Sequence, residues 1–269
     1  MFSSAKEVLE KYNGSASKRF GQNYIFSKNI NQKIVNFAGN LENKTVLEIG
    51  PGPGGLTLEI LAKNPKKFII VELDKLWSEA WSDITKDDKH VAVISSDILH
   101  VDITELKPDI IISNLPYNIS SQVLFKVLPK IHIFEKIVFM FQKELADRIC
   151  ADFGNKTYGK LSVLSQWKSI VRKELALPPG AFTPAPKVHS AVLSFSPKSQ
   201  DSIDFNRFNH LLTVAFSNRR KQVLKLINKE FNFDCSRIFE QIGIKNTARA
   251  EEISVQNFIQ IMQYISNMN

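Results

Sequence analysis

Four consecutive residues, Asn114-Leu115-Pro116-Tyr117, could hold a nucleobase by its exocyclic amine. The side-chain oxygen of Asn114 and the main-chain carbonyl of Leu115 are two acceptors, enough to engage both N–H bonds of such an amine. Pro116 restricts the backbone so that the acceptors can converge, and Tyr117 offers an aromatic face for an unstacked base. The arrangement suits group transfer to the amine nitrogen. A tight turn after a strand is the alternative interpretation.

A glycine-rich segment at residues 50–55 could bind a nucleotide. Gly50, Gly52 and Gly55 satisfy the pattern G-x-G-x-x-G, and Glu72 follows Gly52 by 20 residues. Folds that bind dinucleotides place the acidic residue for the ribose hydroxyls at about this distance. Glycine at such a turn also lets a ligand approach the backbone closely. The pattern alone does not identify the ligand.

Two prolines in the same segment, Pro51 and Pro53, help to choose between ligands. Pyrophosphate is bound by main-chain N–H groups of such a loop, and each proline removes one of these donors. S-Adenosylmethionine, which has adenine and ribose but no phosphate, fits better. Glu72 would then accept hydrogen bonds from the ribose hydroxyls, and Asp97 would accept one from the adenine amino group. Either carboxylate could instead cap a helix, close a turn or lie on the surface.

These residues follow short apolar segments that alternate with amphipathic ones. The apolar segments predict strands at 45–50, 68–73, 91–96, 109–114 and 136–141. Nearly continuous apolar segments rich in Ile and Val are typical of parallel strands covered on both faces. The amphipathic segments predict helices at 56–64, 75–86, 120–130 and 143–150. The alternation predicts an α/β fold with a Rossmann-like, doubly wound sheet, and two further strands, at 170–175 and 188–196, close one edge.

The C-terminal part of the chain has a different pattern. Residues 196–204 are polar and contain one proline, which predicts a linker. Apolar residues at three-to-four spacing then predict helices at 205–220, 222–231, 236–243 and 254–265. Asp204 and Ser254 are expected to cap the first and the last of these helices. We therefore expect a catalytic, cofactor-binding domain at 1–199, with a basic N-terminal arm, and a small helical domain at 200–269.

The 269 residues have a net charge of +8 that is unevenly distributed. Residues 1–40 and 180–269 each have a net charge of +4, whereas residues 41–179 are neutral. Basic flanks fit a protein that holds a polyanion from two sides, although lysine-rich surfaces are also merely solubilising. Cys150 and Cys235 lack metal-ligand spacing, which predicts reduced thiols in a cytoplasmic protein and no metal site. No apolar segment is long enough to span a membrane or to direct export.

Together, the motifs resemble one known family, the small-subunit (16S) ribosomal RNA adenine dimethyltransferases. The resemblance covers nearly the whole chain. The matching segments, in the order of the family's motifs, are 18–25 (KRFGQNYI), 48–52 (EIGPG) with 56–57, 114–120 (NLPYNIS), 142–144, 158–159, 182–188 (FTPAPKV) and 215–221 (AFSNRRK). So many matches in one order make chance agreement implausible.

The resemblance implies a reaction and a partner. Members of the family transfer methyl groups from S-adenosylmethionine to N6 of two adjacent adenines near the 3′ end of 16S rRNA, giving N6,N6-dimethyladenosines. They act on a partly assembled small subunit. We therefore expect 16S rRNA in a 30S assembly intermediate as the partner. The lack of a long apolar segment predicts no membrane partner, and a monomer is the default expectation.

The resemblance also implies roles for individual residues. The expected cofactor contacts are Asn23, Ile25, Gly50, Gly52, Glu72, Asp97 and Asn114. The expected catalytic residues are Asn114, Leu115, Pro116, Tyr117 and Phe182, where Phe182 faces Tyr117 across a flipped adenine unless it is an ordinary core aromatic. The helical domain is expected to bind RNA. The expected RNA contacts are Lys18, Arg19, Lys187, Arg219, Arg220 and Lys221. No general base is expected, because the product proton can leave to water.

Three alternatives stay open. A 23S rRNA adenine dimethyltransferase of the antibiotic-resistance type shares the fold and the N-[LI]-P-Y motif, but residues 50–52 and 219–221 favour the small-subunit family. A non-catalytic ribosome-assembly factor would be expected to have a lesion at residues 114–117, which are intact. A nicotinamide-dependent dehydrogenase is disfavoured by the loop prolines and by the lack of a catalytic His or Tyr-Lys constellation.

Overall fold

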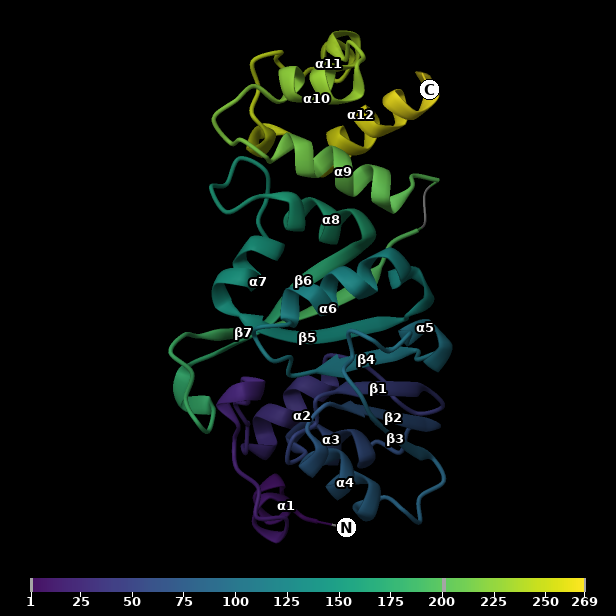
Figure 1. Cartoon of the computed structure of the whole chain (residues 1–269), viewed down its shortest axis with the longest axis vertical. Helices are drawn as coiled ribbons and strands as arrows, with labels where there is room; N and C mark the ends of the chain where they lie inside the picture. Colours follow the sequence, from purple (N-terminus) through teal and green to yellow (C-terminus); the bar gives the residue numbers. More distant parts are fainter. Residues whose placement is uncertain (1, 200–201, 269) are drawn as a thin grey trace. The chain divides into compact units, whose positions relative to one another are not determined.

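The structure is a computed structural model that describes residues 2–199 and 202–268, with only the main chain described at Lys18 and Met268. The chain forms two compact units, whose colours follow the sequence in Figure 1. The first unit runs to Ala146 and also includes Arg172–Pro197. The second unit consists of Asp147–Val171 and the chain from Lys198 onward.

A mixed sheet of seven strands is found among the described residues (Figure 1). The strands are β1 Thr45–Ile49, β2 Lys67–Glu72, β3 Val91–Ser95, β4 Ile110–Ser113, β5 Lys136–Gln142, β6 Ser169–Leu177 and β7 Ser190–Pro197. Their order is β3-β2-β1-β4-β5-β7-β6. β1 to β5 pair in parallel, and β7 is antiparallel to β5. The predicted α/β fold is confirmed, and each predicted strand is present.

The strand order places β1 between β2 and β4. In register, Glu48 of β1 is paired with Ile70 of β2 and with Ile112 of β4. From β1 the chain adds β2 and β3 on one side of the sheet, and it then adds β4 and β5 on the other side of β1. The direction in which strands are added therefore reverses between β1 and β4. Open α/β sheets bind ligands beside the carboxyl ends of the strands at such a reversal. The predicted glycine segment and the predicted turn at 114–117 follow β1 and β4, so the fold brings them together.

Burial explains why the sequence forms these strands. All residues of β4 and all but Thr45 of β1 are buried, as expected for central parallel strands covered on both faces. β3 and β6, at the two edges of the sheet, are mostly half-buried or exposed. The uninterrupted apolar pattern of the central strands and the mixed pattern of the edge strands therefore reflect their places in the sheet.

Helices cover the sheet. Those that begin in the first unit are α1 Ala5–Lys11, α2 Lys28–Asn36, α3 Gly55–Leu61, α4 Lys75–Ile84, α5 Ile103–Leu106, α6 Ser120–Val127 and α7 Lys143–Ile149. Side chains of α2, α3 and α4 share one hydrophobic core with the sheet, in which Ile34, Ile60 and Trp81 are fully buried. Asp74 caps α4 by accepting a hydrogen bond from the Leu76 N–H. The three helices thus cover one face of the strands that carry the ligand loops.

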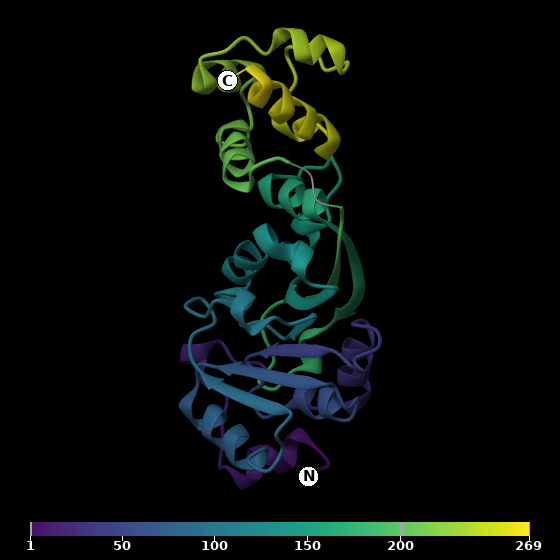
Figure 2. The ribbon, with the colours of Figure 1, turned by 90° about the vertical axis from the view of Figure 1, so that its right-hand side faces the viewer.

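Apart from the first residues of β6, the second unit is mainly helical (Figures 1 and 2). Its helices are α8 Lys160–Lys168, α9 Phe205–Ala215, α10 Val223–Phe231, α11 Ser236–Gln241 and α12 Val255–Met268. The four predicted helices are present, but the first ends at Ala215 and not at residue 220, because residues 216–221 form turns. Asp204 and Ser254 cap α9 and α12 by accepting hydrogen bonds from the N–H groups of Arg207 and Asn257. Residues 200 and 201 of the predicted linker lie outside the described residues.

The compact units differ from the expected division at residue 199. Helix α8, which the sequence analysis did not predict, contacts α9 and α12 and therefore belongs with the C-terminal helices. It is buried at most of its positions and so has no polar face that would produce an amphipathic pattern. Whether 1–199 and 200–269 are functional domains stays a prediction.

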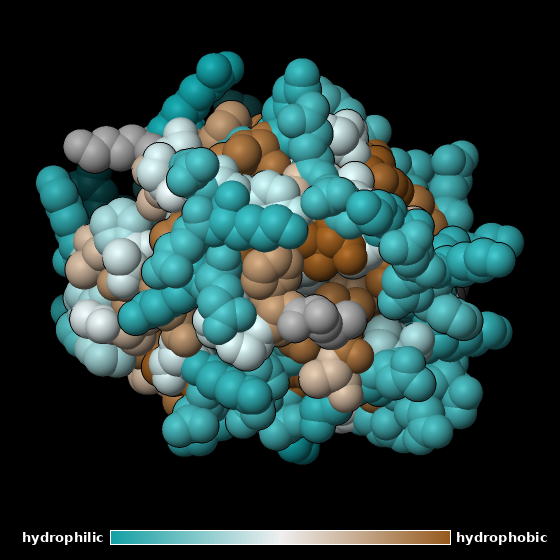
Figure 3. Space-filling model, turned by 90° about the horizontal axis from the view of Figure 1, so that it is seen from below, coloured by the Kyte–Doolittle hydropathy of each residue, from teal (hydrophilic) through white to brown (hydrophobic). Residues whose placement is uncertain are grey.

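Large hydrophobic side chains are exposed at a few positions of the described residues. The face shown in Figure 3 is largely hydrophilic, with hydrophobic side chains gathered near its middle. The exposed large hydrophobic residues are Leu73, Leu76, Ile133, Phe153, Ile170 and Val188. No helix in the described ranges combines the length and the apolar character needed to cross a membrane.

Candidate active site

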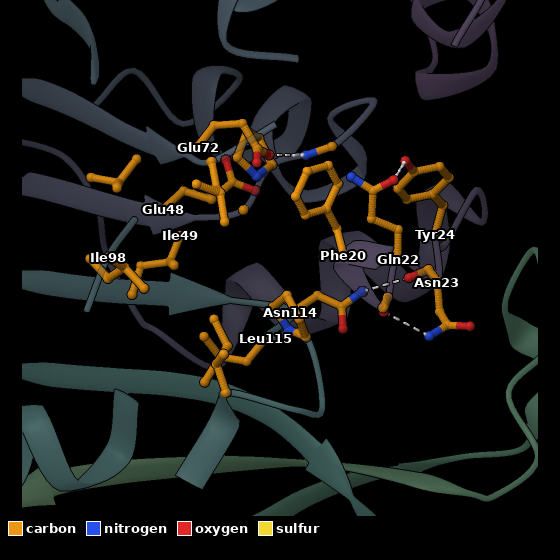
Figure 4. Close-up of a pocket in the computed structure, with 18 of the residues that line it drawn as sticks. Phe20, Gln22, Asn23, Tyr24, Glu48, Ile49, Glu72, Ile98, Asn114 and Leu115 are labelled. Carbon is orange, nitrogen blue, oxygen red and sulfur yellow. Dashed lines mark hydrogen bonds between the residues drawn. The ribbon is translucent and has the colours of Figure 1, made fainter. Parts of the chain in front are cut away.

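A cavity of about 350 Å³ lies at the carboxyl ends of the central strands, a size typical of small-molecule sites. Its walls come from segment 19–25 and from the loops that follow β1, β2, β3 and β4 (Figure 4). The predicted site residues that line it are Arg19, Asn23, Ile25, Gly50, Gly52, Glu72, Asp97, Asn114, Leu115, Pro116 and Tyr117. The fold therefore joins the cofactor residues and the turn at 114–117 in one cavity.

Other predicted site residues lie elsewhere. Phe182 is 4% exposed and belongs to the hydrophobic core that contains Tyr24 and Ile25, outside the cavity wall. Its position opposite Tyr117 across a base stays a prediction. Of the predicted RNA contacts, Arg19 lines the cavity, and the side chain of Lys18 is outside the described part. The others are exposed, namely Lys187, Arg219, Arg220 and Lys221.

The glycines after β1 serve different purposes. Gly50 has a φ of +67°, and a Cβ placed there would meet nothing within 4 Å, so its side faces open space. Gly52 has a φ of +52°, and its Cβ would lie 2.8 Å from a ring carbon of Tyr24. Gly50 thus leaves room for a ligand against the main chain, whereas Gly52 makes room for the packing of Tyr24.

The main-chain donors at residues 50, 52 and 54 of this loop are already engaged. The N–H of Gly50 bonds to the Val71 carbonyl at 2.9 Å, and that of Gly54 bonds to the Pro51 carbonyl at 3.0 Å. The N–H of Gly52 donates to the Glu72 carboxylate at 3.2 Å. With prolines at positions 51 and 53, residues 50–54 offer no row of N–H groups to a phosphate. The geometry agrees with the expectation of a ligand that lacks a pyrophosphate.

Glu72 lies at the end of β2 and is only 6% exposed. One of its carboxylate oxygens accepts a hydrogen bond from the N–H of Gly52 (Figure 4), and the other accepts one from the N–H of Asp74. Burial raises the pKa of Glu72, and these two hydrogen bonds oppose the shift. A carboxylate oxygen that accepts one hydrogen bond can accept another. Glu72 is therefore oriented by the chain and can still accept hydrogen bonds from hydroxyl groups in the cavity.

Glu48 is a cavity residue that the sequence analysis did not single out. It is 1% exposed, and its Oε2 has no hydrogen-bond partner among the described residues. Burial, together with the nearby charge of Glu72, raises the pKa of Glu48 to about 8. Asn31, also in the cavity wall, has a buried Oδ1 that likewise has no partner in the described ranges. Buried acceptors of this kind fit a ligand with donor groups or positive charge.

Two apolar side chains of the cavity were also missed. Leu73, directly after β2, is 51% exposed, and Ile98, after β3, is 3% exposed. Asp97 lies beside Ile98 and accepts a hydrogen bond from the Leu99 N–H at 2.9 Å, so the expected turn is real. That bond uses Oδ1 and leaves Oδ2 for a ligand. A planar base near Asp97 would find apolar surface at Leu73 and Ile98.

The turn after β4 has a defined orientation. The amide nitrogen of Asn114 donates to the Asn23 carbonyl at 3.0 Å (Figure 4). The amide oxygen of Asn114 is thereby directed away from Asn23 as an acceptor. Leu115, next to it, is 1% exposed and anchors the turn in the interior. The arrangement places one oriented acceptor at the cavity wall.

Tyr117 is half-buried at the same wall, and its hydroxyl is 2.6 Å from the Ser190 hydroxyl of β7. Burial raises the pKa of Tyr117, so its phenol stays neutral at ordinary pH. Because the hydroxyl is held by Ser190, the position of the ring is restricted. A fixed neutral ring can serve as a stacking surface for a base.

The segment before α2 is tied to the cavity by a chain of hydrogen bonds. Trp77 Nε1 donates to the Tyr24 hydroxyl at 3.0 Å, and that hydroxyl donates to Gln22 Oε1 at 2.6 Å. The amide nitrogen of Gln22 donates to Asp74 at 2.9 Å. The main chain of Tyr24 also exchanges two hydrogen bonds with that of Thr183. These bonds hold segment 21–25 over the side of the cavity next to Asn114.

The comparisons with known proteins agree on one family. Residues 13–267 match the family model of ribosomal RNA adenine dimethylase. The ribosomal RNA small subunit methyltransferase A of Cereibacter sphaeroides is 38% identical over 260 residues, which are 94% of this chain and 93% of the relative. The protein of that name from Ehrlichia chaffeensis is 37% identical, over 93% of this chain and 96% of the relative.

Two solved structures resemble the chain. A dimethyladenosine transferase from Plasmodium falciparum has a TM-score of 0.79 and 26% identity, over 90% of this chain and 97% of the other. The 23S rRNA methyltransferase ErmE has a TM-score of 0.71 and 17% identity, over 91% of this chain and 100% of the other. The second similarity shows the fold alone.

Proposed function

The chain belongs to the ribosomal RNA adenine dimethylase family, and we propose from this premise that it transfers methyl groups from S-adenosylmethionine to N6 of two adjacent adenines near the 3′ end of 16S rRNA. The products are N6,N6-dimethyladenosines, and the substrate is the rRNA of a small-subunit assembly intermediate. The names of the relatives, which act on the small subunit, support this choice. The observation that carries the proposal is the oriented Asn114 amide at the wall of a cavity suited to a nucleoside.

The cavity residues have complementary roles in holding the cofactor. Glu72 accepts hydrogen bonds from the ribose hydroxyls, and Asp97 accepts one from the adenine amino group. Leu73 and Ile98 supply apolar surface beside the adenine. The main chain at Gly50, and Asn23 and Ile25 of the N-terminal segment, adjoin the methionine end. Glu48 and Asn31 supply buried acceptors, which suit a ligand that has an ammonium and a sulfonium group.

The turn at 114–117 holds the adenine to be methylated. When bound, S-adenosylmethionine supplies an electrophilic methyl group. The Asn114 oxygen and the Leu115 carbonyl accept the two N6–H bonds and so favour a pyramidal nitrogen as positive charge develops on it. Pro116 restricts the turn, and Tyr117 stacks on the extruded base. The product proton leaves to water, so the chain contributes positioning and electrostatics.

The proposal also covers the oligomeric state, the cellular location and the metal content of the protein. We propose that it acts as a monomer in the cytoplasm, on a 30S intermediate, with no metal. Cys150 and Cys235, which form no disulfide within the described residues, are the thiols expected in that compartment.

The deciding experiment measures methyl transfer to unmodified 30S particles. We expect four methyl groups per particle on two adjacent adenines near the 3′ end, located by mapping the modified bases, and no transfer to 23S rRNA. Transfer to 23S rRNA instead would identify the antibiotic-resistance activity. Binding of S-adenosylmethionine without transfer to either RNA would identify an assembly factor. Calorimetric titration with NAD tests the dehydrogenase alternative. We expect no heat of binding, whereas a dehydrogenase would bind NAD.

A further inference from the structure

A loop of the second unit, residues 152–157, is held by several hydrogen bonds although every one of its residues is exposed. The N–H of Asn155 bonds to the Asp152 carbonyl at 3.2 Å, and the Asn155 side chain accepts from the N–H of Thr157 at 3.0 Å. The N–H of Tyr158 then bonds to the Asn155 carbonyl at 3.1 Å. Consecutive turns therefore define the loop, although none of its side chains is buried.

Contacts from other parts of the second unit fix the loop further. Arg219 donates from Nη1 to the Lys156 carbonyl at 2.8 Å and from Nη2 to the Tyr158 carbonyl. The N–H of Gly154 donates to the Glu251 carbonyl at 2.6 Å. Tyr158, at the end of the loop, is 1% exposed and bonds through its hydroxyl to the Ile253 carbonyl. The guanidinium of Arg219, a predicted RNA contact, is thus engaged with the main chain of this protein.

Phe153 lies in this loop and is 58% exposed. Fixing a loop has a cost in conformational entropy, and a phenyl ring that is more than half exposed recovers little of it by burial. Functional loops are commonly held ready by a scaffold in this way, because a loop ordered in advance loses less entropy on binding. Phe153 is thus held at the surface in a loop whose main chain is already fixed.

The charge around the loop indicates the chemistry of a partner that would bind this loop. Lys156 is in the loop, and Arg220 and Lys221 follow Arg219 in a turn closed by the bond from the Lys221 N–H to the Asn218 carbonyl. All three cations are exposed. The acidic residues here are Asp152 in the loop and Glu251 and Glu252 beside it. With Arg219, which bonds to the loop, four cations stand against three acids. An exposed aromatic ring among cations is the combination that binds unpaired nucleotides, by stacking and by phosphate contacts.

We propose that loop 152–157 and residues 220–221 form a second RNA contact, in which Phe153 stacks on an unpaired base, Arg220 and Lys221 contact phosphates, and Arg219 is a positioning residue that holds the loop. This proposal rests on the proposed function, because it takes the RNA to be that of the small-subunit particle. It assigns different roles to three neighbouring cations that the sequence pattern treats alike.

The first test compares substitutions at Phe153 for binding to unmodified 30S particles. Phe153→Ala should weaken binding about 5- to 150-fold, the range expected for one base stacked on an aromatic ring. Phe153→Trp should restore binding, and Phe153→Leu, which keeps apolar surface but removes the aromatic face, should not. The salt dependence should be the same in all of these variants. Ile133→Ala, at an exposed apolar residue of the first unit, is the matched control and should bind like the wild type.

The second test separates Arg219 from its neighbour. Arg220→Ala should reduce the salt slope of binding by about one unit and leave hydrogen exchange in residues 152–158 unchanged. Arg219→Gln should accelerate hydrogen exchange in that loop. A loss of salt slope in Arg219→Gln with exchange as in the wild type would overturn the positioning role.

The outcomes distinguish this proposal from the proposed function. Wild-type binding by Phe153→Ala, in a protein that methylates 30S particles, would overturn the second contact and leave the reaction intact. Full binding by Phe153→Leu would point to an apolar protein surface and would also overturn stacking on RNA. Absence of particle binding by the wild type would remove the proposed function and this proposal together. Thermal unfolding of each variant checks that the fold is retained.

Discussion

At Asn114, the two ends of one amide have different partners. The nitrogen donates to the Asn23 carbonyl, and the oxygen is left as an acceptor at the cavity wall. A rotated amide would lose the bond to Asn23 and would present N–H groups to an incoming amine, which is itself a donor. The bond therefore links the N-terminal segment to the direction of the acceptor. The same reasoning gives Asn23 a role through its main chain, which its side-chain type does not reveal.

The first prediction concerns Asn114→Ala. The substitution removes an acceptor that is stronger toward the developing positive charge than toward the neutral amine. We expect turnover on 30S particles to fall about 100- to 1,000-fold, the usual effect of losing one such group. The dissociation constant for S-adenosylmethionine, measured by calorimetry, should change by less than about tenfold. Asn36→Ala, at an exposed position of α2, is the control, and turnover near the wild-type value in Asn114→Ala would refute the acceptor role.

A second residue-scale prediction concerns Glu48 and pH. Its pKa in the folded chain, about 8, is above the ordinary value of 4.5, so the folded state holds the proton more tightly than the unfolded state. The resulting stabilisation is complete below pH 4.5 and is lost as the pH rises toward 8. Over this window, the free energy of unfolding of the wild type should fall relative to that of Glu48→Gln. Urea unfolding at a series of pH values measures the difference.

The comparison with Glu48→Gln is needed because the pKa of Glu72 is raised as well. Glu72 is present in both proteins, so its contribution largely cancels. Parallel pH profiles for the two proteins would show that Glu48 ionises as freely in the fold as in the unfolded chain. Glu42→Gln, at an exposed position, should leave the profile of the wild type unchanged.

At the scale of the elements, the N-terminal segment depends on the Tyr24 hydroxyl. This hydroxyl accepts from Trp77 and donates to Gln22, which in turn bonds to Asp74 at the start of α4. Its removal leaves the buried Trp77 N–H without its acceptor and frees Gln22 from one bond. The segment is then held by the main-chain bonds to Thr183 and by the bond from Gln22 to Asp74.

The third prediction is therefore that Tyr24→Phe lowers the free energy of unfolding by about 1–3 kcal/mol, the usual cost of an unsatisfied buried polar group. Hydrogen exchange in residues 17–25 should accelerate, and the affinity for S-adenosylmethionine should fall. Tyr264→Phe on α12 provides the matched control. Unchanged exchange in residues 17–25 would contradict a role for the hydroxyl in holding the segment.

The elements also show what the sequence can and cannot reveal. The strands were predictable because central parallel strands are apolar without interruption, as in β4, and α9 was predictable because its two faces differ. Helix α8 escaped because burial at most of its positions removes that contrast. Glu48 could have been noticed as a lone acid in an apolar strand. The engagement of Arg219 with carbonyls of a distant loop depends on tertiary structure, and no local pattern encodes it.

For the whole molecule, the residues that line the cavity all belong to the first unit, whereas the loop with Phe153 belongs to the second. Ligand binding slows hydrogen exchange only where opening would destroy the site. The fourth prediction is that saturating S-adenosylmethionine slows exchange in residues 19–25 and 48–56 and leaves α9 to α12 unchanged. Hydrogen exchange with mass spectrometry measures both regions in one experiment. Slower exchange in α9 to α12 would mean that the second unit takes part in cofactor binding.

The assignment of α8 to the second unit affects how such proteins can exchange parts. The chain leaves the first unit after Ala146, returns at Arg172 and leaves again after Pro197, so each unit is encoded by two separated stretches of sequence. A chimera joined at residue 199 would combine α8 of one parent with α9 and α12 of another. Its helical unit would then contain mismatched packing surfaces. Recombination between relatives should preserve folding only when residues 147–171 and the C-terminal helices come from the same parent.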